Sequence, residues 1–278
     1  MADGSAASGT LGGSVASGTL EDAFGRLDDL AADAAAGRLA LFLDFDGTLA
    51  PIVDRPGDAR MSDELRGCLQ ALARRMPVAV VSGRDLDDVA RRVALDGIAY
   101  AGSHGYCMRH ADGREEEQGR EFLGDLDAAE RALHAAFDGA GDVVVERKRF
   151  AIAVHYRRSP VDPNLLERRV RACLSGVLSA PERLEMHGGK MIFEVRPRFD
   201  WHKGRAVMHL LACTGGRAPL FIGDDVTDEQ AFRTLREEGP PGSVGIVVDH
   251  DDRPTWATLR LDDVAAVERF LVAFSARL

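Results

Sequence analysis

The chain has 278 residues, of which 45% are hydrophobic and 29% charged, and its formal net charge is −10 at neutral pH. This length accommodates one or two domains, each with a hydrophobic core of its own. The negative charge argues against nucleic acid or an anionic membrane as a partner, and no run of about 20 apolar residues predicts a transmembrane helix.

Residues 1–36 are expected to form a flexible N-terminal tail. Residues 1–19 are rich in Gly, Ala, Ser and Thr, and they lack the basic and apolar regions of a signal peptide. The cysteines are far apart and predict neither a zinc site nor a disulfide framework: Cys68, Cys107, Cys173 and Cys213. We therefore expect a cytoplasmic protein. The oligomeric state stays open, with a monomer favoured.

The first predicted core element is a buried strand over Leu39–Leu43, an apolar run too short for an independent helix. The motif that follows it places Asp44 and Asp46 where the strand gives way to a loop. Because side chains alternate along a strand, these two carboxylates share one side and can act on one group. Asp44, ionised at its ordinary pKa, could attack phosphorus, while a protonated Asp46 could give a proton to the departing sugar oxygen.

A second strand is predicted over Pro77–Val81, after a helix over Asp63–Met76. At its end, the hydroxyl of Ser82 and the unobstructed amide of the next glycine can bind phosphate oxygens. The same dipeptide also fits a simple helix-capping turn. Asp85 is expected to cap the next helix, Leu86–Leu95.

The C-terminal part contributes an ammonium group and more carboxylates. Lys203 begins a predicted helix, Lys203–Ala212, and can offset the negative charge on the nucleophile and the phosphoryl group. A strand over Pro219–Ile222 ends at Asp224 and Asp225. Because a carboxylate that attacks a phosphate needs a hard cation held by oxygen ligands, these two residues are candidates to complete a Mg²⁺ site with Asp44.

Strand and helix candidates alternate, which is typical of βαβ units. Thr227 and Gln230 fit a capping box for a helix over Asp228–Glu237, and a strand at Gly245–Val248 and a helix at Asp263–Phe274 complete the pattern. Every chemical motif falls at the carboxyl end of a strand, where open parallel sheets bind ligands. We predict an α/β fold whose parallel-sheet core is discontinuous, formed by residues 37–105 and 199–278.

Residues 106–198 contain none of these motifs and predict an inserted α+β cap domain. Along residues 190–196 and 142–157, apolar side chains alternate with polar ones, so that one face of each strand packs and the other stays polar. Facing the core, the polar face would bind sugar hydroxyls and exclude water when the cap closes, through Glu146, Lys148, Arg157, Lys190 and Glu194. The same residues also fit an ordinary solvated sheet face with cross-strand ion pairs.

The order of the motifs resembles that of the haloacid dehalogenase-like (HAD) superfamily, whose core is Rossmann-like. The resemblance implies that Asp44 is the nucleophile, Asp46 the acid/base, and Ser82 and Lys203 the groups that bind the phosphoryl oxygens. It also implies a Mg²⁺ site formed by Asp44, the backbone carbonyl of Asp46 and Asp224, with Asp225 and Asp228 as weaker candidates. Asp228 also fits a residue that only stabilises a helix N-terminus.

From about residue 38 onward, the chain also resembles the trehalose-6-phosphate phosphatase family. The matching strings are DFDGTLAPIV at 44–53, VSGR at 81–84, GSHG at 102–105, VERK at 145–148, AVHYR at 153–157, GKMIFEVRP at 189–197 and GDDVTDE at 223–229. The resemblance implies hydrolysis of trehalose 6-phosphate, with Glu146, Lys148, Lys190 and Glu194 binding the disaccharide from the cap and Arg84 and His104 from the core. Ser103 departs from the family, which often has Glu before the His-Gly pair.

Three other functions remain open at this point. Another phosphatase of the same fold, acting on sucrose phosphate or mannosyl-phosphoglycerate, would share the core and differ in the cap. A hexose phosphomutase would return the phosphate to a sugar. A non-catalytic sugar-phosphate sensor would not need both Asp44 and Asp46. For His104 alone, the sequence fits a buried structural histidine equally well.

Overall fold

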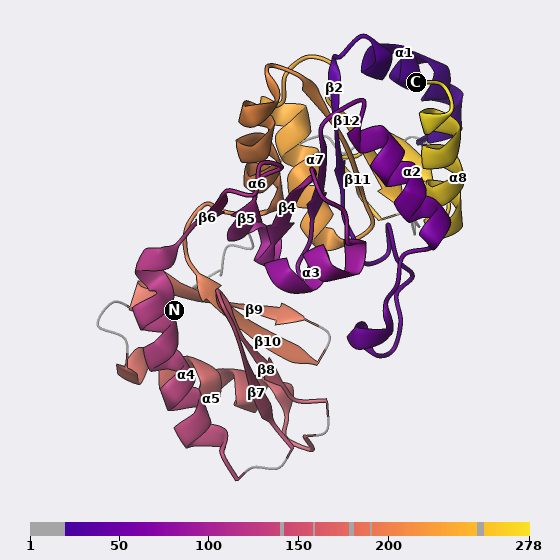
Figure 1. Ribbon diagram of the computed structural model, residues 1–278. Coiled ribbons are helices and arrows are strands. Elements are labelled where there is room, and N and C mark those ends of the chain that lie inside the picture. The colour runs from indigo at the N-terminus through magenta and orange to yellow at the C-terminus, as the bar shows by residue number, and fades with distance from the viewer. Residues whose placement is uncertain (1–19, 140–141, 158, 178–180, 190, 249–252) are drawn as a thin grey trace, which may run out of the picture.

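The computed structural model describes residues 20–139, 142–157, 159–177, 181–189, 191–248 and 253–278. These residues form two units, each built around its own sheet, one of nine strands and one of four (Figure 1). The arrangement confirms the predicted α/β fold with a parallel-sheet core and an inserted α+β cap. Lys190, which the sequence assigns to substrate binding, lies outside the described residues.

The core sheet is parallel from its first strand to β4 and ends in two antiparallel strands. Its central strands are apolar runs buried on both faces, as parallel strands between helical layers require. In spatial order the strands are β1 (Glu21–Asp22), β13 (Leu259–Leu261), β12 (Val244–Val248), β11 (Ala218–Gly223), β2 (Leu39–Leu43), β3 (Val78–Val81), β4 (Ala99–Gly102), β5 (Cys107–Arg109) and β6 (Glu115–Glu117).

Helices cover both faces of this sheet. Leu41 and Leu43 of β2 point to one layer, whereas Phe42, between them, points to the other. The first layer contains α1 (Leu27–Ala35), α2 (Asp63–Ala73), α3 (Leu86–Val93) and α8 (Val264–Ser275). The second contains α6 (Lys203–Leu211) and α7 (Val226–Glu238). No helix in the described part of the chain is long and apolar enough to cross a bilayer.

The cap has an antiparallel sheet in the order β7 (Val144–Lys148), β8 (Ala151–His155), β10 (Ile192–Pro197) and β9 (Leu184–Gly189). Two helices, α4 (Leu123–Phe137) and α5 (Pro163–Val177), pack on one face of it through a separate apolar cluster (Figure 1). The alternation along β10, with Phe193 and Val195 buried and the residues between them partly exposed, follows the predicted pattern. The opposite face of this sheet is therefore left to polar side chains.

Short 3₁₀ helices connect these elements, at Ala23–Arg26, Pro56–Asp58, Ser103–Gly105, Arg120–Phe122, Pro181–Arg183 and Ala212–Thr214. Aromatic side chains pack against one another where the cap adjoins the core. Tyr106 of the core stacks on Phe150 of the cap hairpin, with ring centroids 5.2 Å apart, and Phe122 stacks on Phe199 at 5.4 Å. The cap thus rests on the core through packed aromatic side chains at the linkers.

Two predicted boundaries are corrected. Within the expected flexible tail of residues 1–36, the described residues 20–36 are folded, because β1 pairs with β13 and α1 packs on α8. The apolar spacing of Leu27, Leu30, Ala31 and Ala34 was the sequence signal for this helix. Residues 107–117, assigned to the cap from the sequence, supply the last two strands of the core sheet.

Two predicted helix caps are also corrected. Helix α7 begins two residues early, and its capping box is formed by Asp225 and Asp228 rather than by Thr227 and Gln230. Asp85 occupies the N-cap position of α3, but its carboxylate makes no capping hydrogen bond and instead accepts one from the hydroxyl of Ser103. Acidic residues cluster at both helix starts, so sequence spacing alone did not identify the capping group.

Replacing Leu30 by alanine should lower the free energy of unfolding by about 2–4 kcal/mol, because the substitution opens a cavity between α1 and the core. Urea denaturation measures this change. Asp29→Ala on the exposed side of the same helix is the control and should cost less than about 1 kcal/mol. Equal, small effects of both substitutions would show that α1 does not belong to the cooperative core.

Candidate active site

The predicted chemical residues converge at one edge of the core sheet. Strands β2, β3 and β11 are neighbours and run parallel, so the residues that follow them, Asp44, Ser82 and Asp224, meet at their carboxyl ends. A cleft of about 580 Å³ opens there between core and cap. The predicted residues that line it are Asp44, Asp46, Ser82, Arg84, His104, Glu146, Lys148, Lys203, Asp224 and Asp225.

A buried ion cluster forms the floor of the cleft. The ammonium nitrogen of Lys203 lies 3.0 Å from Oδ1 of Asp44 and 2.8 Å from Oδ1 of Asp228. These side chains are only 2%, 6% and 0% exposed, respectively. Oδ2 of Asp228 accepts hydrogen bonds from the backbone amides of Asp224 and Asp225, so this carboxylate also fixes the start of α7. Through its contact with Asp44, Lys203 links the C-terminal segment of the core to the N-terminal segment.

Burial and mutual repulsion perturb the acidic groups of the cluster. Burial raises the pKa of Asp44 well above its ordinary value, although the Lys203 ammonium opposes this effect. Burial, reinforced by Asp228 and Asp225, raises the pKa of Asp224 to about 7. Burial disfavours the charged form of Lys203, but the neighbouring carboxylates outweigh it and raise the pKa. The sequence predicts an ordinary pKa for Asp44, and the burial of this side chain overturns that prediction. Nearby positive charge is therefore needed to stabilise its ionised form.

The donor set at this cluster fits a hard divalent cation such as Mg²⁺. Carboxylate oxygens of Asp44, Asp224 and Asp228 all lie within 4.8 Å of one another, and oxygen ligands are those that Mg²⁺ prefers. A cation there would also relieve the repulsion that raises their pKa values. Because Lys203 and two amides already occupy the oxygens of Asp228, Asp44 and Asp224 are the better placed side-chain ligands.

Gly47 leaves room for this carboxylate arrangement. Its backbone has a φ of +82°, and a Cβ atom built at this position would lie 2.0 Å from Oδ2 of Asp224. The hydroxyl of Thr48 lies 3.4 Å from the other carboxylate oxygen of Asp224. The loop after β2 therefore shapes the position of a side chain that comes from β11, far away in the sequence.

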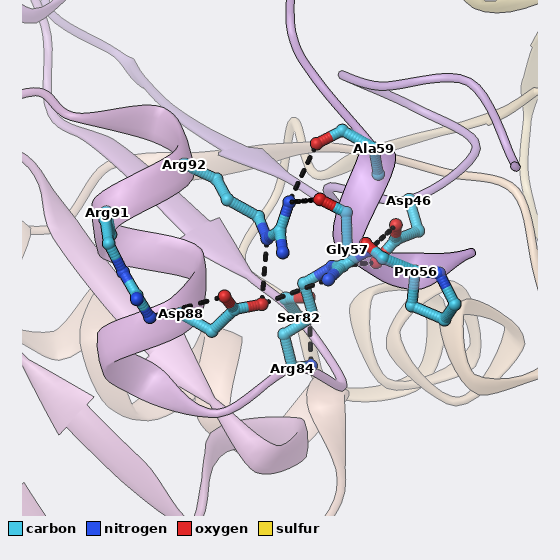
Figure 2. Close-up of polar contacts among 9 residues, drawn as sticks. All are labelled: Asp46, Pro56, Gly57, Ala59, Ser82, Arg84, Asp88, Arg91 and Arg92. Carbon is cyan, nitrogen blue, oxygen red and sulfur yellow. Dashed lines mark hydrogen bonds and ion pairs between the residues drawn. The ribbon is translucent and has the colours of Figure 1, made fainter.

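Asp225 and Asp46 have other partners in this structure. Oδ1 of Asp225 accepts hydrogen bonds from the amide and the hydroxyl of Thr227, at 2.5 and 2.7 Å, and so caps α7. Asp46 turns toward Arg84, which donates two hydrogen bonds of 2.6 Å to its carboxylate (Figure 2). Of the predicted metal-binding side chains, the structure brings those of Asp44, Asp224 and the weaker candidate Asp228 into the carboxylate cluster, and leaves those of Asp46 and Asp225 outside it.

Arg84 links Asp46 to helix α3 and to the loop after β2. It also bonds to Oδ2 of Asp88, at 3.0 Å, and to the carbonyl of Pro56, at 2.9 Å (Figure 2). Asp88 in turn accepts a hydrogen bond from Arg92, whose guanidinium also bonds to the Ala59 carbonyl. Sequence reasoning missed Asp88 and Arg92. Their spacing of four residues along one helix face, continuing from Arg84, was the available signal.

The tight turn after β4 packs against Ser82, which the sequence assigns to phosphate binding. The amide of His104 donates to the carbonyl of Ser82 at 2.9 Å, and Ser103 and His104 both have positive φ values, 50° and 57°. Burial, reinforced by the Lys203 ammonium, lowers the pKa of His104 to about 3, so its ring is neutral. Its Nδ1 atom is buried and has no hydrogen-bond partner among the described residues, and the residue lines the cleft.

On the cap side, the cleft is lined by Glu146, Lys148 and His155. His155 was missed, although its Nε2 atom lies 2.8 Å from Glu146 and the β7–β8 register places both residues on one face. Glu194 lies behind Lys148, at 3.4 Å, and burial opposes its ionisation, but Lys148 and Arg196 hold its pKa below the usual range. Arg157 is exposed and lies outside the set of residues that line the cleft.

The loop after β2 also contributes apolar side chains to the cleft. Ile52 and Val53 line it and are exposed, Ile52 to 76%. Sequence reasoning did not identify them, because a short apolar stretch in a loop has no periodicity from which to infer a role. They give one wall of an otherwise charged cleft a surface that can pack against the apolar face of a ligand.

Comparisons with known proteins connect these features to a family. Residues 42–265 match the sequence pattern of the family described as "Trehalose-phosphatase". "Probable trehalose-phosphate phosphatase 9" of Oryza sativa subsp. japonica is 38% identical over 280 residues, which cover 90% of this chain and 73% of that protein. "Trehalose-phosphate phosphatase" of Mycobacterium avium (strain 104) is 41% identical over 253 residues, and the chain spans only 63% of its length.

A solved structure supports the fold. The C-terminal domain of trehalose-6-phosphate phosphatase from C. albicans superposes with a TM-score of 0.73. The match covers 94% of this chain and 99% of that domain, at 23% sequence identity. The path of the chain, with the cap inserted into the core, is thus shared with a protein of very different sequence.

In the metal-free protein, the contribution of Asp224 to stability should fall as the pH rises toward and through about 7. The pKa of Asp224 is about 7 in the folded state, against about 3.9 in an unfolded chain, so between these values only the folded state retains the proton. A folded state that binds more protons loses stability as the pH increases. Thermal unfolding midpoints, measured with chelator from about pH 5 to about pH 8, should decline less in Asp224→Asn than in the parent.

His104 is present in both the parent and Asp224→Asn. Its lowered pKa destabilises the folded state below about pH 6.5, and this effect cancels in the comparison between the two. Added Mg²⁺ should raise the midpoint of the parent most at the alkaline end, where it replaces the lost protons. Parallel declines in parent and variant would contradict the assignment of a raised pKa to Asp224.

Proposed function

The chain belongs to the trehalose-phosphatase family, and we propose that it is a Mg²⁺-dependent phosphatase that hydrolyses trehalose 6-phosphate to trehalose and phosphate. The observation that carries this proposal is the contact of Lys203 with buried Asp44 and Asp228, next to Asp224, at the floor of a cleft whose other wall is polar. A buried carboxylate beside an ammonium group and a cation site is suited to attack phosphorus.

In the first half of the reaction, a carboxylate oxygen of Asp44 forms a bond to phosphorus. The bond between phosphorus and the 6-oxygen of trehalose breaks. Asp46, once it has exchanged a hydrogen bond from Arg84 for a proton from solvent, gives that proton to the oxygen. In the second half, Asp46 takes a proton from a water molecule that attacks the phosphorus of the aspartyl-phosphate. Phosphate leaves and the carboxylate of Asp44 is restored.

The other core residues bind and orient the reacting groups. Ser82, the amide of Gly83 and Lys203 bind phosphoryl oxygens, and the two hydrogen bonds from Arg84 set the direction of the Asp46 carboxylate. Asp44, Asp224 and the backbone carbonyl of Asp46 would hold Mg²⁺, which would supply positive charge to offset repulsion between carboxylate and phosphate. Asp228 positions Lys203 and the start of α7.

The cap binds the sugar. Glu146, Lys148 and His155 present donors and acceptors to the disaccharide hydroxyls, and Glu194 orients Lys148. We place the moving unit near residues 118–198, between β6 and the linker that returns to α6, and its closure excludes water from the aspartyl-phosphate. All four cysteines are free thiols, which supports a cytoplasmic protein, and we propose a monomer that acts in trehalose biosynthesis.

Phosphate release from a panel of sugar phosphates tests the substrate and the nucleophile together. With Mg²⁺, we expect the highest kcat/KM for trehalose 6-phosphate over sucrose 6-phosphate, mannosyl-3-phosphoglycerate and glucose 6-phosphate, because the cap offers contacts to a second sugar ring. Chelator should abolish release. Asp44→Asn should remove it, a loss of roughly 10⁴-fold or more, since the nucleophile is lost.

Each alternative predicts a distinct result of this panel. Preference for sucrose or mannosyl phosphates would reject the substrate and retain the chemistry. Isomerised sugar phosphate without free phosphate would indicate a mutase. Binding of trehalose 6-phosphate without turnover would indicate a sensor, and full activity of Asp44→Asn would reject the nucleophile.

Gly47→Ala should lower kcat/KM roughly 10- to 100-fold and raise the Mg²⁺ concentration needed for half-maximal activity. A methyl group at this position would displace the Asp224 carboxylate. Gly37→Ala is a matched control, since its φ is also positive, +70°, but its Cβ would meet no atom within 4 Å. It should lower the thermal midpoint and leave kcat/KM unchanged. Equal kinetic losses in both variants would attribute the effect to backbone strain alone.

A further inference from the structure

We propose that His110, Glu116 and His209 form a second metal site, distinct from the aspartate cluster, that binds a transition-metal ion, with Zn²⁺ as the metal that suits its ligands best. The site lies beside the outer strands of the core sheet, where β5 and β6 meet α6. The reaction proposed above uses none of its residues.

Three ligand atoms converge on one point. Nε2 of His110 lies 2.9 Å from Oε1 of Glu116, and Nε2 of His209 lies 2.5 Å from the same oxygen. All three atoms lie within 4.8 Å of one another. Two ligands on a tetrahedral Zn²⁺ ion stand about 3.3 Å apart, so small movements of the rings would admit the ion.

Sheet register and helix packing explain this convergence. Glu116 pairs with Met108 across the β5–β6 hairpin, and His110 is two residues beyond Met108, so all three side chains share a face. Met108 packs in the apolar cluster that includes Ala206 and Leu210 of α6. The same face therefore lies against α6, which brings His209 to the pair from 93 residues away.

Two further observations indicate a site shaped for a ligand. His110 is only 7% exposed, and its buried Nε2 atom makes no well-aligned hydrogen bond within the described chain, although it points at Oε1 of Glu116. The other oxygen of Glu116 accepts a hydrogen bond from Arg114 at 3.1 Å. A carboxylate that is oriented in this way keeps its Oε1 atom directed at both imidazoles, as outer hydrogen bonds do for metal ligands.

The ligand types separate the two metal sites. Imidazole nitrogen with one carboxylate is a donor set for Zn²⁺ and related ions, and two histidines with one glutamate leave a fourth position for water. Mg²⁺ prefers oxygen ligands and would bind at the aspartate cluster. Each ion thus has a preferred site on the same chain.

A bound ion would cross-link two elements that are important to the proposed phosphatase. β6 is the last core strand before the chain enters the cap, and α6 begins with Lys203. The ion would hold this edge strand against the helix that carries Lys203. Its role would be structural, fixing the point from which the cap moves.

A Co²⁺ titration of the full chain, freed of metal by chelator and then kept in excess Mg²⁺, tests this site. Co²⁺ substitutes for Zn²⁺ and reports its ligands by visible absorption. We expect saturable binding of one Co²⁺ per chain without thiolate charge-transfer bands. Co²⁺ should also quench Trp201, whose ring centroid lies 5.9 Å from that of His209, and Zn²⁺ should displace it.

Glu116→Gln and His209→Asn should weaken Co²⁺ binding roughly 100-fold or more and remove the quenching, because each takes away a ligand. Both residues are partly exposed, and circular dichroism verifies that the variants fold. His134→Asn is the matched control, because His134 contacts only Asp138 among the described acidic side chains, and it should bind Co²⁺ like the parent. Undiminished binding by the two site variants, displacement by Mg²⁺, thiolate bands or the lack of saturable binding would each overturn the proposal.

Discussion

The organisation of this protein depends on one buried interaction, the contact of the Lys203 ammonium with the carboxylates of Asp44 and Asp228. Removing charges from water is costly, and a buried ammonium or carboxylate persists only when partners compensate for lost hydration. Here Asp224 adds further negative charge, so one lysine does not balance the cluster. The excess of carboxylates over ammonium groups favours a divalent cation at this position.

The sheet topology makes this cluster possible. β2 lies between β3 and β11, and these strands come from both halves of the discontinuous core. Their carboxyl ends bring together the carboxylates of Asp44 and Asp224 and the hydroxyl of Ser82, while α6 supplies Lys203 from the second helical layer. Because α6 directly follows the linker that returns from the cap, residues that position the cap also position Lys203. The aromatic contacts of Tyr106, Phe150 and Phe199 provide that linkage.

In the reaction proposed above, the cap recognises the sugar and the core carries the reacting groups. The core side of the cleft holds buried charges whose pKa values are strongly perturbed, whereas the cap side holds partly exposed groups that can exchange one hydrogen-bond partner for another. Such an arrangement lets the sugar be exchanged without disturbing the reactive groups. The Arg84 network, which joins Asp46 to α3 and to the loop after β2, extends the rigid part of the site to its rim (Figure 2).

The central strands, most of the core helices and the residues at the strand ends could be predicted from the amino-acid sequence, because apolar runs, alternation and helix periodicity are local properties. The sequence did not show which acidic residue after β11 contacts Lys203. Asp225 and Asp228 both lie at the start of α7, and only the packing of α6 against α7 places Asp228 rather than Asp225 next to the lysine. Tertiary structure alone decided the raised pKa of Asp44, the pairing of Asp46 with Arg84, and the meeting of His110, Glu116 and His209. These depend on burial and on contacts between residues far apart in the chain, for which local sequence carries no signal.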